Sequence, residues 1–191
     1  MKTYKKILVA ALLGVVSVSA NAQDDNTDAH NIVVSIPEVA LLDLEASAGT
    51  SIELGPDAPL EAGEMVSFPS QDNSIWLNYS SIVGSTTEPS RNVTVQISSG
   101  SVPAGTFIEV EAAADAGNGD GTMGAPSSAL TLSTAPQNIL TAIGSAYTGD
   151  GVNNGHNLSY SMDLLPAAGS YALLDFDQSN TMEITYTLSD N

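Results

Sequence analysis

The sequence has no cysteine, which excludes a disulfide framework and any thiol chemistry. A chain of this kind is held together by buried apolar surface and by ladder hydrogen bonds, and its length is sufficient for one domain with a substantial core. Aromatic residues are also few, with 1 Trp, 6 Tyr and 3 Phe. The composition is rich in Ser, Thr, Gly, Ala, Asn and Val, which favours short strands and many turns.

Positive charge is almost absent. The chain has 4 Lys and Arg residues against 22 Asp and Glu, and Lys2, Lys5 and Lys6 all lie in the first 22 residues. Residues 23–191 therefore carry only Arg91, for a net charge of −21 (1 − 22). One arginine cannot form a cationic patch, which disfavours nucleic acid and anionic lipid as partners; we expect no nucleic-acid partner. Arg91 is expected to have an acidic partner, and Glu88 is the obvious candidate.

Histidine is scarce as well, since only His30 and His156 are present. A nucleophilic triad would need one of them as its base, yet both lie in polar loop sequence and no G-x-S-x-G motif occurs. Zinc catalysis needs more nitrogen or sulfur ligands than the chain has. A glycosidase needs only two carboxylates, but such enzymes also use aromatic residues to bind sugar and basic residues as partners. Residues 23–191 have one Trp and one Arg, which argues against a sugar-cleaving site. The sequence predicts a protein that is not an enzyme.

The first 22 residues have the pattern of a secretory signal peptide. A basic start is followed by the apolar run "ILVAALLGVVSVSA" and by "ANA", which predicts cleavage between Ala22 and Gln23. We therefore expect a secreted protein, located outside the cell, at the cell surface or in the periplasm. No second apolar run of about 18 residues follows, so no membrane-spanning helix is expected. Residues 23–30 are predicted to be a disordered acidic leader, and residues 31–191 a single β-sandwich domain.

Short apolar runs with a period of two dominate the rest of the chain. The clearest is 91–99, in which Val93, Val95 and Ile97 share one face. Because no amphipathic helix is evident, we expect an all-β fold, an antiparallel immunoglobulin-like β-sandwich of about 8–10 strands. The strands are predicted at 31–36, 39–45, 51–54, 74–81, 91–99, 106–113, 129–133, 158–164, 170–176 and 181–188; 137–144 fits either a strand or a helical turn.

A Pro-Ala-Gly motif occurs twice, as "VPAG" at 102–105 and as "LPAAG" at 165–169. Proline ends a ladder because it has no N–H, and glycine permits a positive φ. An aromatic residue, Phe107 or Tyr171, follows two positions after each glycine. The motif therefore predicts two hairpins that use the same turn, each followed by a return strand.

Two Gly- and Asn-rich loops could offer oxygen ligands to calcium. The sequence "DAGNGDG" and the turn "DFDQSN" present carboxylate and amide oxygens, and calcium takes six to eight oxygen ligands. The spacing differs from that of an EF-hand loop, so solvated turns are the alternative. The candidate metal ligands are Asp115, Asn118, Asp120, Asp175 and Asp177; no other cofactor is expected.

Two further groups of residues are candidates for contacts with partners. Trp76 and Tyr79 could stack on a sugar if they are exposed, although packing within the sandwich is the alternative. Ile32, Val34 and Ile36 alternate with polar or smaller residues, so this segment could add as a strand to another sheet.

The residues quoted so far resemble those of bacterial fimbrial subunits. The start "NIVVSIPEVALLDLE" and an "LPAAGSY" turn before a terminal "EITYTL" strand are similar to the spore-coat-U-like and related pilin families. The chain also looks like the uncharacterised secreted β-sandwich proteins of marine Bacteroidota. The resemblance implies an immunoglobulin-like sandwich that assembles into surface fibres. Two features depart from it: the pilins mostly contain a disulfide, and the leader here has nothing apolar to insert, so "NIVVSI" itself would be the donor.

These observations favour a secreted, non-catalytic structural or adhesive protein of the bacterial surface or extracellular matrix, such as a fimbria-like subunit. Its expected partners are other surface proteins or further copies of itself, joined by strand addition. The alternatives are a carbohydrate-binding module with a polysaccharide partner and a calcium-dependent binding protein.

Overall fold

The computed structural model describes residues 26–178 and 180–191. The predicted signal peptide at 1–22, its cleavage position and residues 23–25 of the predicted leader lie outside the described residues. The chain divides into two units, Met1–Ser35 and Ile36–Asn191. In the first unit, residues 26–35 are exposed and belong to no helix or strand. Every strand of the described residues lies in the second unit.

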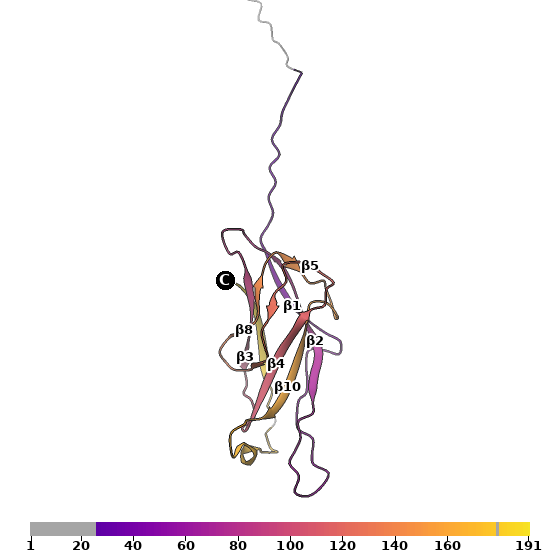
Figure 1. The fold of residues 1–191 in the computed structure, drawn as a ribbon, viewed down its shortest axis with the longest axis vertical. Helices are drawn as coiled ribbons and strands as arrows, with labels where there is room; N and C mark the ends of the chain where they lie inside the picture. The colour runs from indigo at the N-terminus through magenta and orange to yellow at the C-terminus, as the bar shows by residue number, and fades with distance from the viewer. Residues whose placement is uncertain (1–25, 179) are drawn as a thin grey trace, which may run out of the picture. The chain divides into compact units, whose positions relative to one another are not determined.

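The second unit is an antiparallel β-sandwich, which confirms the predicted fold class (Figure 1). Its first sheet has seven strands in the order β5-β9-β2-β10-β4-β7, with β1 paired to β2 outside this path. The second sheet has four strands in the order β11-β3-β8-β6. In the first sheet the bounds are β1 Val39–Ala46, β2 Gln71–Ile82, β4 Thr106–Asp115, β5 Asp120–Gly121, β7 Leu130–Thr131, β9 Ala146–Tyr147 and β10 His156–Leu164; in the second they are β3 Arg91–Ser99, β6 Ala125–Pro126, β8 Gln137–Ile143 and β11 Glu183–Asp190.

The core lies between the two sheets and follows the period of two that the sequence shows. In β3, Val93, Val95 and Ile97 are buried, while the residues between them are only half-buried. The same alternation buries every second residue of β4 and β10. Each inward face needs apolar surface opposite it, which is why the two sheets pack face to face. No α-helix occurs among the described residues; the one helical turn is the 3-10 helix η1, Ser170–Leu173.

Three predicted strands are wrong. Residues 31–36 and 51–54 belong to no strand, and η1 occupies the predicted strand at 170–176. Pro37 has no N–H to donate, which separates the first of these segments from β1. In the third segment, Gly169 has a φ of 89° and begins a helical turn in place of a strand. The ambiguous segment at 137–144 is a strand, β8.

The two predicted Pro-Ala-Gly hairpins are also wrong. The first motif joins β3 to β4, which lie in different sheets, so the chain crosses the sandwich there. The second leads into η1. The motifs instead pack against each other: Leu165 N donates to Gly105 O at 2.9 Å. A Cβ on Gly105 would lie 2.3 Å from Ser170 O, so only glycine fits at this contact.

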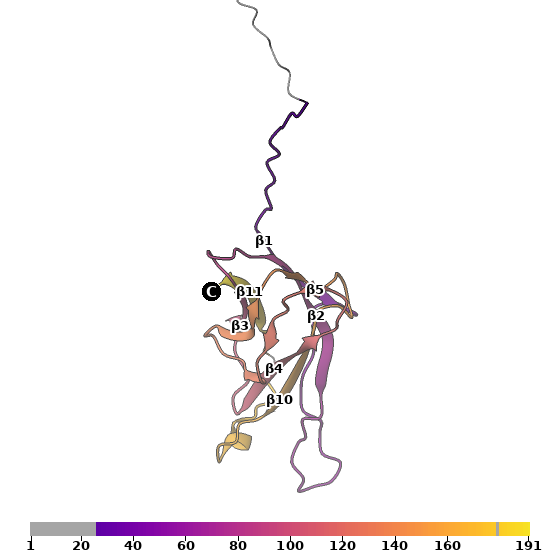
Figure 2. The same ribbon diagram turned by 45° about the horizontal axis from the view of Figure 1, so that its top comes forward.

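The sandwich has two different ends, shown in Figures 1 and 2 with the C-terminus at one and η1 at the other. The Arg91 end holds the start of β1, the end of β2, the start of β3 and the end of β11, since Val39 pairs with Ile82 and Arg91 with Asp190. The Pro-Ala-Gly end holds the end of β3, the start of β4 and the start of β11. β11 therefore runs from the Pro-Ala-Gly end to the Arg91 end.

Candidate assembly site at the arm and the edge strand

Residues 26–36, here called the arm, carry a run of exposed large apolar side chains. Ile32, Val34 and Ile36 are 76%, 80% and 77% exposed, and Val33 between them is 93% exposed. No residue of the arm pairs with a strand. Large apolar side chains left in water in a run of this kind mark an interaction segment. The alternation that the sequence shows is therefore present, but its partner is not within the described residues of the chain.

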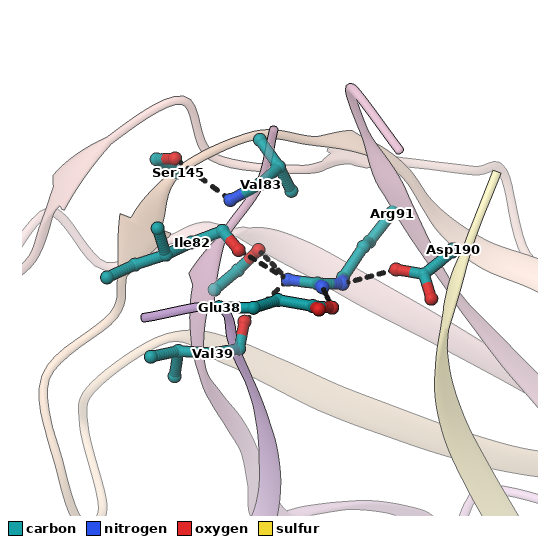
Figure 3. A network of polar contacts seen from close by, with 8 residues as sticks. Glu38, Val39, Ile82, Val83, Arg91, Ser145 and Asp190 are labelled. Carbon is teal, nitrogen blue, oxygen red and sulfur yellow. Dashed lines mark hydrogen bonds and ion pairs between the residues drawn. The ribbon is translucent and has the colours of Figure 1, made fainter. Parts of the chain in front are cut away.

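The arm joins the domain at a buried arginine. Arg91 begins β3, and its side chain is 1% exposed. Burial of a guanidinium is costly unless all of its donors are satisfied, and here the ends of three strands and the segment before β1 supply the acceptors (Figure 3). The acceptors are Glu38 Oε1 at 2.5 Å, Asp190 Oδ1 at 2.7 Å, Val39 O at 2.5 Å, Ile82 O at 3.1 Å and Ser81 Oγ at 3.2 Å.

The prediction that Arg91 pairs with Glu88 is wrong. The two ion pairs that Arg91 forms are with Glu38 and Asp190, which lie 53 and 99 residues away along the chain. Strand pairing brings them together, because β1 begins and β11 ends beside the first residue of β3. Glu88 lies near them: one carboxylate oxygen each of Glu38, Glu88 and Asp190 lie within 4.8 Å of one another. The Arg91 guanidinium already neutralises part of this charge.

Arg91 is the only Lys or Arg among residues 26–178 and 180–191, and it is buried in these contacts. The surface of this part of the chain therefore offers no free Lys or Arg. A contact between the described parts of two copies cannot be held by a lysine or arginine salt bridge, so apolar surface and backbone hydrogen bonds must supply the attraction there.

β11 is the edge strand of the second sheet and pairs only with β3 among the described residues. Its other edge thus has unpaired N–H and C=O groups. Ile184, Tyr186 and Leu188 face the core but are only partly buried, and the same holds for Leu42 and Leu44 of β1, which lies beside β11. The apolar side chains along this edge of the sandwich are therefore incompletely buried.

The side chain of Tyr186 is held by a residue of the first sheet. Its hydroxyl lies 2.6 Å from the hydroxyl of Tyr160 on β10, which links the two sheets. Burial raises the pKa of Tyr160 to about 12 and the pKa of Tyr186 well above its usual range. The edge strand is therefore attached to the core by a neutral hydrogen bond between phenols.

Of the two aromatic residues singled out for ligand stacking, Tyr79 is buried inside the sandwich. Its ring stacks on His156, with 5.7 Å between ring centroids, and its hydroxyl lies 3.3 Å from His156 Nε2. His156 Nδ1 lies 2.8 Å from Ala113 O. Burial lowers the pKa of His156 and raises that of Tyr79. Trp76 is half-buried on the outer side of β2, opposite Glu45 of β1 and Asn157 of β10.

Four of the five predicted metal ligands, Asp115, Asn118, Asp120 and Asp175, use their side chains in hydrogen bonds to backbone groups. Asp115 Oδ2 accepts from Gly117 N at 2.8 Å, and Asp120 Oδ1 accepts from Gly121 N at 2.8 Å. Asn118 Nδ2 donates to Asn153 O at 3.0 Å, and Asp175 Oδ1 accepts from Asp177 N at 3.0 Å. Among the described residues, the structure brings together none of these carboxylates as a group of three; Glu38, Glu88 and Asp190 form the one such group.

A comparison of the chain with protein-family models, curated proteins and solved structures finds no match. The described residues contain no helix of the length and apolar character that a membrane span requires. The class that the fold and the site define is therefore an antiparallel β-sandwich with an exposed apolar arm and an open edge strand.

Proposed function

We propose that this is a secreted, non-catalytic structural protein of the bacterial surface or extracellular matrix, whose copies assemble by strand addition. The arm of one copy adds along the free edge of β11 of another. The observation that carries the proposal is the arm itself: Ile32, Val34 and Ile36 form an alternating apolar face that is more than three-quarters exposed. An exposed apolar face of this kind marks a segment that binds a partner, and strand addition is the mode that fits an extended segment.

The free edge of β11 supports the same proposal from the acceptor side. An added strand would hydrogen-bond to its unpaired backbone groups, and its inward side chains would cover the partly buried Ile184, Tyr186 and Leu188. Residues 31–36 extended as a strand span about 20 Å, and the 8 residues of β11 about 26 Å. One arm therefore covers most of one edge.

The energetics require all three apolar side chains. Complete burial of each stabilises the complex by roughly 1.5–3 kcal/mol, while association costs roughly 4–15 kcal/mol in lost freedom. The new ladder hydrogen bonds add to the favourable side. Because the free energies of burial and of these hydrogen bonds together only slightly exceed the cost of association, removal of one inward side chain is expected to weaken assembly at least about tenfold.

A pair of variants on adjacent arm residues tests this proposal. Val34→Asp puts a carboxylate on the inward face of the added strand, and Val33→Asp puts the same charge on the outward face. We expect sedimentation velocity and negative-stain electron microscopy to show concentration-dependent polymers for the wild type and Val33→Asp, and monomers for Val34→Asp. A wild type that stays monomeric at high concentration, or equal loss in both variants, would refute strand addition by the arm.

A further inference from the structure

The Pro-Ala-Gly end carries a second exposed apolar surface, which no sequence pattern indicated. Outside the arm, most of the exposed large apolar residues lie on two segments of this end: Leu60, Met65, Leu165, Tyr171, Leu173 and Phe176. Met65 and Tyr171 line one shallow groove of about 370 Å³ together with Leu164. Phe176 is 97% exposed on a tight turn, so its whole ring projects into water. We call these residues the apolar cap.

The Arg91 end carries a complementary hollow. A shallow groove of about 480 Å³ lies there, between the turn after β2, the residues before β3 and the turn after β8. It is lined by small apolar and hydroxyl residues, among them Val83, Pro89, Ala142 and Ser145, and by no charged side chain. Val83 and Ser145 lie beside the Arg91 contacts, as Figure 3 shows. At an end rich in carboxylates, this groove is an uncharged patch.

Strand direction decides which end of a second copy meets the apolar cap. β11 runs toward the Arg91 end, so an arm added antiparallel runs toward the Pro-Ala-Gly end and leaves β11 there. The body of the donor copy then lies against the acceptor's apolar cap. A parallel arm would instead bring two Arg91 ends together, each with Glu38, Glu88 and Asp190, and the described chain offers no free Lys or Arg between them. The stronger antiparallel ladder favours the first arrangement.

The connection between arm and domain is too short to keep the two bodies apart. Only Pro37 and Glu38 separate Ile36 from β1, a span of about 10 Å even when extended. Glu38 is held at the domain by Arg91. An antiparallel arm that leaves β11 at its start therefore brings the donor's Arg91 end into contact with the acceptor's Pro-Ala-Gly end.

We infer that the apolar cap of one copy docks in the uncharged groove at the Arg91 end of the next copy, with Phe176 as the inserted side chain. This inference rests on the proposed assembly and adds the contact between bodies and its direction. The two surfaces are different and lie at opposite ends, so the contact is heterologous and does not close on itself. Copies joined in this way form a linear polymer in which every subunit points in the same direction.

Because the chain has no cysteine, mixing two single-cysteine variants tests the contact between bodies directly. Phe176→Cys is mixed with Ser85→Cys, whose position lines the groove, and disulfide-linked dimers are measured after mild oxidation. We expect this pair to cross-link at least tenfold more than Phe176→Cys mixed with Glu111→Cys, which lies exposed on β4 away from both ends. Equal yields, or cross-linking of Phe176→Cys with itself as the main product, would overturn the inference.

A second pair of variants keeps this test separate from that of the proposed function. Val33→Cys mixed with Thr187→Cys reports on arm addition, because both positions lie on the outward face of the proposed ladder. If this pair cross-links and the Phe176→Cys/Ser85→Cys pair does not, strand addition stands and the docking of the cap fails. If neither does, the proposed assembly fails as well. Phe176→Asp is expected to shorten the polymers at least tenfold by electron microscopy, whereas Phe176→Leu retains them.

The direction of the arm has its own readout. In an antiparallel ladder, moving the arm cysteine from Val33 to Ser35 shifts its preferred β11 partner toward the start of that strand, from Thr187 to Thr185. A shift in the opposite direction would show parallel addition and would overturn the end-to-end arrangement.

Discussion

The two ends of the sandwich are stabilised by different means. At the Arg91 end, one buried guanidinium with five acceptors holds together the start of β1, the ends of β2 and β11 and the start of β3. At the Pro-Ala-Gly end, Leu165 N donates to Gly105 O, and Gly105 packs against Ser170 without space for a Cβ. The first end presents carboxylates around an uncharged groove, and the second presents exposed apolar side chains with the carboxylates of Glu64, Asp175 and Asp177 beside them. A domain with unlike ends has a direction, which is what a linear polymer of identical subunits requires.

The largest effect is expected at the Arg91 end. Arg91→Met leaves the carbonyl oxygens of Val39 and Ile82 without a donor and removes the only cation from beside Glu38 and Asp190. Because these carboxylates are partly exposed, we expect the free energy of unfolding to fall by about 2–4 kcal/mol in urea titrations, less than for a fully buried pair.

Glu88→Gln is the matched control for this prediction, since Glu88 forms no ion pair with Arg91 among the described contacts. It should change the free energy of unfolding by no more than about 0.5 kcal/mol. A loss as large as that of Arg91→Met would show that Glu88 is the true partner of Arg91.

The next effect is expected at the Pro-Ala-Gly end. Gly105 and Gly117 both have a φ of 81°, but a Cβ would lie 2.3 Å from Ser170 O at the first and meets nothing within 4 Å at the second. Both alanine variants carry the cost of a positive φ, roughly 1–2 kcal/mol. Gly105→Ala adds the clash, so we expect it to be less stable than Gly117→Ala by a further 1–3 kcal/mol or so in thermal unfolding. Equal losses would mean that the two Pro-Ala-Gly turns do not pack as described.

A smaller change in stability is expected at acid pH, and it comes from the buried side chain of His156. Burial lowers the pKa of His156, so the unfolded chain takes up a proton near pH 6.5 while the folded chain does not. This contribution to stability is present above pH 6.5 and is lost as the pH falls through the folded value. We expect His156→Gln to be less stable at pH 7 and to lose less stability than the wild type between pH 6.5 and 5. Parallel stability curves for the two proteins would contradict a buried neutral His156.

The corresponding alkaline effect involves the tyrosine pair that holds β11. The pKa of Tyr160 is raised to about 12, so the unfolded chain releases this proton near pH 10, whereas the folded chain releases it only at a higher pH. Stability is therefore complete below pH 10 and falls as the pH rises toward 12. The double variant Tyr160→Phe/Tyr186→Phe removes both groups and should show a shallower decline in circular dichroism. An unchanged slope would place the two hydroxyls in contact with water.

A strand could be predicted from the sequence wherever apolar residues alternate along it. The alternation of Val93, Val95 and Ile97 gives the bounds of β3 and its inward face without any knowledge of its neighbours. The pairing of strands could not be predicted in this way. The Pro-Ala-Gly turns suggested hairpins because a turn reports only a change of direction, and the same turn serves a crossing between sheets.

The candidate site shows the same limit. The shared apolar face of Ile32, Val34 and Ile36 is visible in the sequence, but only the structure shows that residues 26–178 and 180–191 leave it without a partner. The partners of Arg91 were missed because Glu38 and Asp190 come from distant segments, whereas a sequence reading favours a near neighbour such as Glu88. The apolar cap was missed because Leu60, Tyr171 and Phe176 lie on separate loops without a shared period.

The most direct test of this account is hydrogen–deuterium exchange in the purified protein, measured below and above the concentration at which it polymerises. The account predicts that slowing of amide exchange on polymerisation is largest in two peptides, one spanning the arm and one spanning β11, and that Val34→Asp abolishes the slowing in both. Polymers that form without added protection in Glu183–Asp190, or with protection confined to another edge strand such as β6 or β7, would contradict it.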